Sequence, residues 1–287
     1  MNFQHDLYPF TGCYRNVNGH RLHMLDEGRG DTLLMLHGNP TWGFLYRNVA
    51  AALLGEPLRL VMPDLIGLGF SDKPGAEAHQ LDRHGEWMGR LIDELALEDL
   101  VFVGQDWGGP IGLRALAERP ARATAMVILN TVVGPPRPGF KATAFHRFAR
   151  MPVLSTFAFR ILGVPQVALW PAQGDRSTMR GEVGRAYRYP LRSRRTNVAP
   201  LALARMVPDS LEHSTIAPLQ RCHDYVASFK GPIEIVWGEK DPVLGSVIKH
   251  LEQLLPQARV TRTQAGHFLQ EEVSDEIAAA VRRVAQT

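Results

Sequence analysis

The chain has 287 residues, of which 45% are hydrophobic and 21% are charged, and this composition suits one large α/β domain with an insertion or two modest domains. The net charge of +3 is too small to indicate nucleic-acid binding, and no apolar run reaches transmembrane length. No basic segment followed by an apolar one opens the chain, so we expect no signal peptide and a cytoplasmic location. Cys13 and Cys222 lie far apart, and we expect free thiols in a reducing compartment rather than a disulfide.

Short apolar runs predict the strands of a sheet. The first is an alternating run at residues 21–25, which follows the turn Asn18-Gly19 and predicts an edge strand. Continuous apolar runs, typical of strands buried on both faces, come next at residues 32–36, 58–62, 100–103, 126–129 and 233–237. A last strand is predicted at residues 258–262, and helical patterns separate the runs at residues 46–54, 84–96, 110–119, 246–255 and 274–284. This alternation predicts a doubly wound, mostly parallel sheet.

The alternation stops after Leu129. Residues 134–215 are rich in proline and arginine and show no strand pattern, which predicts a helical cap over the carboxyl edge of the sheet, where ligands bind in open α/β folds. The core domain would then comprise residues 1–133 and 216–287. The cap holds thirteen basic and four acidic residues, a charge of +9. Two interpretations stay open: a solvated helical surface, or a docking face for a protein partner, a second copy of the chain or an anionic surface.

Asp106 stands at the end of a predicted strand, just before a helical pattern. The local sequence is Gly104-Gln-Asp-Trp-Gly108. A small-x-Asp-x-small turn between a strand and a helix is the pattern of a nucleophile elbow with Asp in place of Ser. A carboxylate nucleophile can displace a leaving group from a saturated carbon and form an alkyl ester on the enzyme, whereas a serine would suggest acyl transfer.

Asp241 and His267 follow later predicted strands. They lie in Trp237-Gly-Glu-Lys-Asp-Pro242 and in Ala265-Gly-His-Phe268. Each alone could be an ordinary turn residue. Together with Asp106 they give the order nucleophile, acid and histidine that α/β-hydrolases use, which predicts a catalytic triad.

Asn39 and Trp107 occupy the two turns nearest to Asp106. Asn39 lies where this fold places half of its oxyanion hole, in Leu36-His-Gly-Asn-Pro40, and Trp107 directly follows Asp106. An indole donates one hydrogen bond and an asparagine amide donates two. Alone, Trp107 could be a core residue and Asn39 a turn residue. As a pair, they predict a site that holds an anion such as a departing halide.

These motifs resemble those of the haloalkane dehalogenase family in the α/β-hydrolase superfamily. The resemblance covers nearly the whole chain and rests on five stretches: His37-Gly-Asn-Pro-Thr-Trp42 with Tyr46-Arg47, Pro63-Asp-Leu-Ile-Gly-Leu-Gly-Phe-Ser-Asp-Lys-Pro74, Gln105-Asp-Trp-Gly-Gly109, Trp237-Gly-Glu-Lys-Asp-Pro242 and Gly266-His267. It implies an α/β-hydrolase fold, with a mostly parallel eight-stranded sheet, flanking helices and a helical cap.

The resemblance also implies a mechanism for a small apolar substrate. Asp106 would attack the halogen-bearing carbon, Asn39 and Trp107 would bind the halide ion, and His267 would activate water against the ester. Asp241 would orient His267. No metal and no organic cofactor are implied.

The resemblance leaves two assignments to be made among subfamilies. One subfamily carries its acid just after the strand that precedes the cap, but Asn130 stands there and cannot ionise, which favours Asp241. Another subfamily uses a tryptophan of the cap for the halide; Trp170 could serve, although Asn39 makes it unnecessary.

Three other functions remain alternatives. A β-lactone decarboxylase, which gives an alkene and carbon dioxide, resembles the same motifs, including Asn39 and Trp107. An epoxide hydrolase would need two cap tyrosines, and Tyr187 and Tyr189 are spaced so that their side chains would diverge on a helix or a strand. A non-catalytic ligand-binding protein of the same fold is the third alternative.

Overall fold

The computed structural model describes residue 7 and residues 10–137, 139–140 and 143–285. Eight strands form one sheet in the order β1-β2-β4-β3-β5-β6-β7-β8. Their bounds are β1 Gly12–Val17, β2 His20–Gly28, β3 Asp31–Leu36, β4 Leu58–Pro63, β5 Leu100–Gln105, β6 Ala123–Leu129, β7 Ile233–Gly238 and β8 Arg259–Thr263. All pairs from β4 to β8 are parallel, while β1–β2 and β2–β4 are antiparallel. The prediction of a mostly parallel eight-stranded sheet is therefore confirmed.

The prediction that residues 21–25 form an edge strand is wrong. They belong to β2, which lies inside the sheet because β1 pairs with its outer side. The two strands form a hairpin through Asn18 and Gly19, whose φ angles of 50° and 85° suit the tight turn that the sequence indicated. No apolar run in the sequence marks β1, because most of its residues are exposed or half-buried, and this strand was not predicted.

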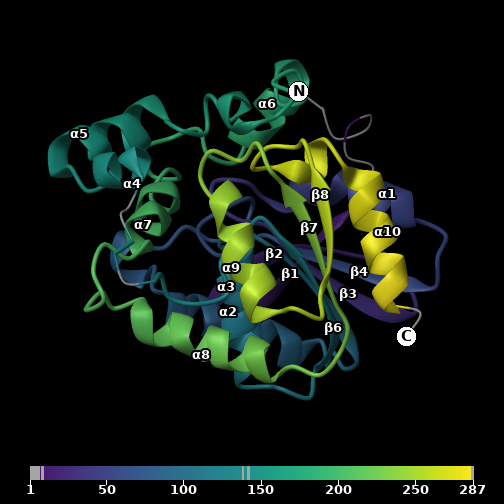
Figure 1. Cartoon of the computed structure of the whole chain (residues 1–287). Coiled ribbons are helices and arrows are strands. Elements are labelled where there is room, and N and C mark those ends of the chain that lie inside the picture. Colours follow the sequence, from purple (N-terminus) through teal and green to yellow (C-terminus); the bar gives the residue numbers. More distant parts are fainter. Residues whose placement is uncertain (1–6, 8–9, 138, 141–142, 286–287) are drawn as a thin grey trace.

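Helices cover both faces of the sheet (Figure 1). The side chains of β5 show why both faces are apolar. Leu100 and Phe102 pack in one core cluster with residues of α2 (Leu81–Glu94), α3 (Gly108–Ala117), α8 (Ile216–Ser228) and α9 (Ile248–Leu254). Val101 and Val103 pack in the opposite cluster with residues of α1 (Arg47–Leu53) and α10 (Ser274–Ala285). Alternate side chains of a strand point to opposite faces, so a strand covered twice must be apolar throughout.

Helices joined by turns and loops, without a strand, make up the described residues between β6 and α8. They are α4 Ala144–Ala149, α5 Pro152–Phe157, α6 Gly181–Arg188 and α7 Ala199–Met206, and a π-helical turn at Ala158–Leu162 continues α5. Figure 1 shows α4, α5 and α7 together at the side of the molecule and α6 above the sheet. A small apolar cluster that includes Ala149 of α4, Phe159 of the π-helical turn and Leu201 of α7 holds these three segments together.

Helix α8 was not predicted from the sequence either. Its apolar residues Leu219, Cys222 and Val226 recur every three or four positions and are buried against the core, which includes α3. Pro218 hides the pattern, but it lies in the first turn, where a proline costs no helical hydrogen bond. Cys222 and Cys13 are both free thiols, as expected. In the part of the chain that the structure describes, no helix is long and apolar enough to cross a bilayer.

Candidate active site

Asp106 occupies a tight turn between β5 and α3. Its φ of 47° lies in the left-handed region, which is sparsely populated by residues other than glycine and asparagine or aspartate. The turn is held on both sides, because the Asp106 N–H donates to the Asn130 carbonyl oxygen (3.0 Å) and Thr131 Oγ1 donates to the Asp106 carbonyl oxygen (2.6 Å). A Cβ on Gly108 would lie 2.1 Å from the Leu36 carbonyl oxygen, so only glycine fits there. The strained turn thus projects the Asp106 side chain away from the backbone.

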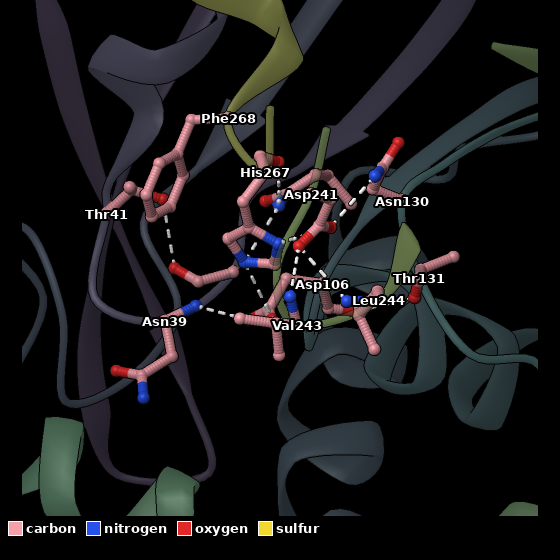
Figure 2. Close-up of polar contacts among 12 residues, drawn as sticks. Asn39, Thr41, Asp106, Asn130, Thr131, Asp241, Val243, Leu244, His267 and Phe268 are labelled. Atoms are coloured by element: carbon pink, nitrogen blue, oxygen red, sulfur yellow. Dashed lines mark hydrogen bonds and ion pairs between the residues drawn. The ribbon is translucent and has the colours of Figure 1, made fainter. Parts of the chain in front are cut away.

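The Asp106 carboxylate faces two groups from distant parts of the chain (Figure 2). Its Oδ1 accepts a hydrogen bond of 2.7 Å from the Asn39 backbone N–H, and its Oδ2 lies 3.6 Å from His267 Nε2. A Cβ on Gly38 would come within 2.3 Å of Asp106 Oδ1. Position 38, just after β3, must therefore be glycine for the Asp106 carboxylate to occupy this position. The side chain remains 16% exposed, which leaves room for an approaching reactant.

His267 lies between two carboxylates. Its Nδ1 is 2.8 Å from Asp241 Oδ2 on the side opposite Asp106, and its own backbone N–H donates to the Ala172 carbonyl oxygen (2.8 Å). Burial would lower the pKa of His267, but the charges and hydrogen bonds of Asp241 and Asp106 outweigh burial and raise this pKa to about 10. The imidazole is therefore set up to carry a proton while both carboxylates are charged.

Asp241 is almost fully buried and is held by four donors. Asn130 Nδ2 (2.8 Å) and His267 Nδ1 reach its Oδ2, and the backbone N–H groups of Val243 (2.7 Å) and Leu244 (3.0 Å) reach its Oδ1. Burial alone would raise the pKa of Asp241, but the charge of His267 and these hydrogen bonds together lower it. A carboxylate with this many donors stays charged inside the protein.

Two buried amides that the sequence analysis did not assign support this arrangement. Asn130 was considered only as a missing acid; in the structure its Oδ1 also accepts from the Gly238 N–H (2.7 Å), so it fixes the end of β7 and Asp241 together. Gln105 Nε2 donates to the His267 carbonyl oxygen (3.0 Å). The position of each residue at the end of a parallel strand was the only signal in the sequence.

Asn39 and Trp107 both adjoin Asp106, Asn39 through its backbone N–H and Trp107 in the chain, but they differ in the hydrogen-bond donors that they offer. The Asn39 side chain points away from Asp106 (Figure 2), and its Nδ2 donates to the Pro200 carbonyl oxygen of α7 (3.0 Å), while its buried Oδ1 has no partner among the described residues. Trp107 is 7% exposed, and its indole N–H forms no hydrogen bond with any residue that the structure describes. The indole N–H of Trp107 is therefore available to donate to a ligand, and so is one of the two amide hydrogens of Asn39.

The residues weighed for other functions lie elsewhere. Tyr187 is fully buried and donates to Glu271, and burial raises its pKa well above the ordinary value. Tyr189 packs near Phe70, with the Arg192 guanidinium 3.7 Å from its ring centroid. Arg180 likewise stacks over Trp170, 4.5 Å from its ring centroid. Neither tyrosine forms a described contact with Asp106. Among the described residues, no group of three or more His, Cys, Asp and Glu side chains is arranged to hold a metal ion.

Comparison with known proteins identifies the family to which the chain belongs. The alpha/beta hydrolase fold family model matches residues 31–273. The chain is 33% identical to a haloalkane dehalogenase of Mycolicibacterium paratuberculosis, with 94% of this chain and 91% of that protein covered. Haloalkane dehalogenase 2 of Mycobacterium tuberculosis is 34% identical, with 96% and 95% covered.

Solved structures give the same result. A mutant of the haloalkane dehalogenase DatA from Agrobacterium tumefaciens has a TM-score of 0.85 and 25% identity, with 96% of this chain and 97% of that chain covered. Fold, site geometry and sequence relatives together show that the chain belongs to the haloalkane dehalogenase family of the alpha/beta hydrolase fold.

Proposed function

We propose that this protein is a hydrolase that cleaves the carbon–halogen bond of small apolar haloalkanes through a covalent ester on Asp106. The observation that carries the proposal is the position of His267 Nε2, 3.6 Å from the Asp106 carboxylate and backed by Asp241 at 2.8 Å. The relatives named as haloalkane dehalogenases support the same reaction. In this proposal residues 134–215 act as the cap, and residues 1–133 and 216–287 form the catalytic core.

In the first step, Asp106 Oδ2 attacks the carbon that bears the halogen. A carbon–oxygen bond forms as the carbon–halogen bond breaks, and the halide leaves with the electron pair. Oδ1 is already held by the Asn39 N–H, whereas Oδ2 is the oxygen that faces His267. Fixing one oxygen orients the carboxylate for in-line attack by the other, and this positioning lowers the entropic cost of reaching the transition state.

In the second step, His267 removes a proton from a water molecule that attacks the carbonyl carbon of the ester. The negative charge then develops on Oδ1, where the Asn39 N–H donates. Esterification removes the charge of Asp106, which is one of the causes that raise the pKa of His267 to about 10. The pKa of His267 is therefore lower in the ester than in the free enzyme, and it is in the ester that the imidazole must be neutral to accept a proton from water. Asp241 stays charged and stabilises the imidazolium. As the intermediate collapses, the bond between the ester carbon and the alkyl oxygen breaks, and His267 gives its proton to the leaving alkoxide, which departs as the alcohol. The second proton of the water passes to solvent, and the Asp106 carboxylate is restored.

The halide would be held by the Trp107 indole N–H and by the remaining amide hydrogen of Asn39. Trp107 directly follows Asp106 in the chain, the Asn39 backbone N–H is hydrogen-bonded to Asp106, and the Asn39 amide, which donates to Pro200, has one further hydrogen to give. Donors that point at a developing anion in a site with little water stabilise the transition state more than the ground state. This assignment uses the Trp107 indole N–H, which has no hydrogen-bond partner among the described residues, and the Asn39 amide hydrogen that Pro200 does not accept.

Trp107→Phe tests the halide site. The variant loses the indole N–H but keeps an aromatic ring, and we expect bromide to bind about tenfold more weakly or worse, as for loss of one hydrogen bond to a charge. Product inhibition by bromide measures this. Trp87→Phe is the matched control, because Trp87 is similarly buried but lies in α2. Equal bromide affinity in wild type and Trp107→Phe would remove Trp107 from the site.

Asp241→Asn tests the role of the acid. Loss of the Asp241 charge removes the main cause that raises the pKa of His267, so this pKa should fall and ester hydrolysis should reach its plateau at lower pH. The plateau itself should drop by about 10⁴-fold, because the imidazolium loses its counter-charge. Single-turnover hydrolysis of the ester, measured across a range of pH, gives both the pKa of His267 and the plateau rate. Glu239→Gln, an exposed acid in the same turn, is the control. An unchanged pH profile in Asp241→Asn would contradict the proposal.

The overall reaction is tested by halide release. Bromobutane and dibromoethane should release bromide with the purified protein, and Asp106→Ala should not exceed the rate without enzyme. A β-lactone run in parallel tests the alternative: carbon dioxide release from the lactone with no bromide from any haloalkane would replace the proposed reaction with decarboxylation.

A further inference from the structure

Large apolar side chains gather on the outer surface of the segment that contains α5. In this helix and in the π-helical segment that continues it, Ser155, Ala158 and Phe159 face inward and are buried. The opposite side is open to solvent, and Val153 is the most exposed of its large apolar residues at 83%. The exposed members are Met151, Val153, Leu154, Phe157, Ile161, Leu162 and Val167. Because Val153, Phe157 and Ile161 are four residues apart, they form a stripe along one helical face.

Arginines border this apolar face. Arg188, Arg192, Arg194 and Arg195 are exposed, and none of them forms an ion pair with a carboxylate in the described part of the chain. They are physically joined to the apolar segment, because the Arg160 guanidinium donates to the Arg194 carbonyl oxygen (3.2 Å). The positive charges of these four arginines are therefore not neutralised by carboxylates of the described residues.

A groove connects the two features. Its volume is about 540 Å³, and Ile161, Leu162 and Val167 line it together with Arg185, Arg188 and Arg192. The one acid in its lining, Glu182, pairs with Arg185 at 3.2 Å. The groove therefore offers an apolar wall and two guanidinium groups, those of Arg188 and Arg192, that have no carboxylate partner among the described residues, which suits a molecule with an acyl chain and an anionic head.

We propose that this face of the cap docks on a membrane surface that contains anionic phospholipids. Interfacial helices combine an exposed apolar stripe with arginines at its border, and here Val153 and Phe157 would enter the lipid while Arg188 and Arg192 bind headgroups. A second copy of the chain is disfavoured, since a two-fold contact would bring two caps of charge +9 together. An acidic protein would satisfy the arginines but gives no reason for aliphatic side chains as exposed as Val153.

Flotation with vesicles tests the proposal without reference to the enzymatic activity. The full-length protein should bind vesicles of equal parts phosphatidylcholine and phosphatidylglycerol at low salt, and should not bind phosphatidylcholine alone. Val153→Asp, Phe157→Asp and the double variant Arg188→Gln/Arg192→Gln should each weaken binding about tenfold or more. Leu54→Asp and Arg83→Gln/Arg259→Gln are matched controls, because these side chains are exposed on the core, and they should bind as wild type does.

Three results would overturn the proposal. The first is no binding to the anionic vesicles. The second is binding that the Val153 and Phe157 variants leave unchanged, with polyglutamate competing equally well, which would identify an acidic polypeptide as the partner. The third is a wild-type oligomer in solution that Val153→Asp converts to a monomer, which would make this face an interface between copies of the chain.

Discussion

Asp106→Ala should reduce bromide release from bromobutane by about 10⁶-fold, to the rate without enzyme, because no other group can form the ester. Alanine also tolerates the φ of 47° poorly, at a cost of about 1–2 kcal/mol, so part of any loss could reflect a less stable fold. Asp106→Asn separates the two effects, since asparagine accepts this conformation and has a similar shape. It should be as inactive as Asp106→Ala but melt close to wild type. Substantial release by the alanine variant would show that another group starts the reaction.

His267→Phe should stop the reaction after one turnover and leave an alkyl group on Asp106. The first step does not need a base, so one equivalent of bromide should appear, and the ester should then persist. Asp241 keeps its three other donors in this variant, which supports folding around the aromatic ring. Intact mass should show one butyl group in place of one proton, and peptide mapping should locate it at Asp106.

The control for trapping is the double variant Asp106→Ala/His267→Phe, which should show no adduct. Continued turnover by His267→Phe would mean that water is activated elsewhere. A bromide burst without any adduct on Asp106 would place the covalent bond on a different side chain. Absence of both bromide and adduct with several haloalkanes would favour a ligand-binding role over catalysis.

The sheet and the positions of its ionisable residues could be predicted because both depend on local sequence. Apolar runs identified every parallel strand except β8, which was predicted from its place at the end of the alternation. Asp106, Asp241 and His267 each follow a predicted parallel strand, so the parallel order alone brings them to one edge. β1 escaped prediction because an edge strand exposes much of its surface. α8 escaped because a proline in its first turn masked the apolar spacing.

The directions of the amide side chains could not be predicted. Asn39 was expected to bind a halide together with Trp107, but one of its amide hydrogens is donated to Pro200, 161 positions further along the chain. Asn130 was rejected as an acid, yet it binds the acid that replaces it, 111 positions away. An amide rotates to suit whichever partners the tertiary structure supplies, and no pattern near it in the sequence specifies those partners.

The hydrogen bond from Asn39 to Pro200 ties a residue beside the nucleophile to the backbone of α7. If Asn39 also binds halide, any shift of α7 that breaks this bond changes how the amide presents itself to the ion. Thermodynamic reciprocity then requires the converse: an occupied halide site must alter the free energy of moving α7. Release of the halide and displacement of α7 would then be thermodynamically coupled, so that each changes the equilibrium of the other.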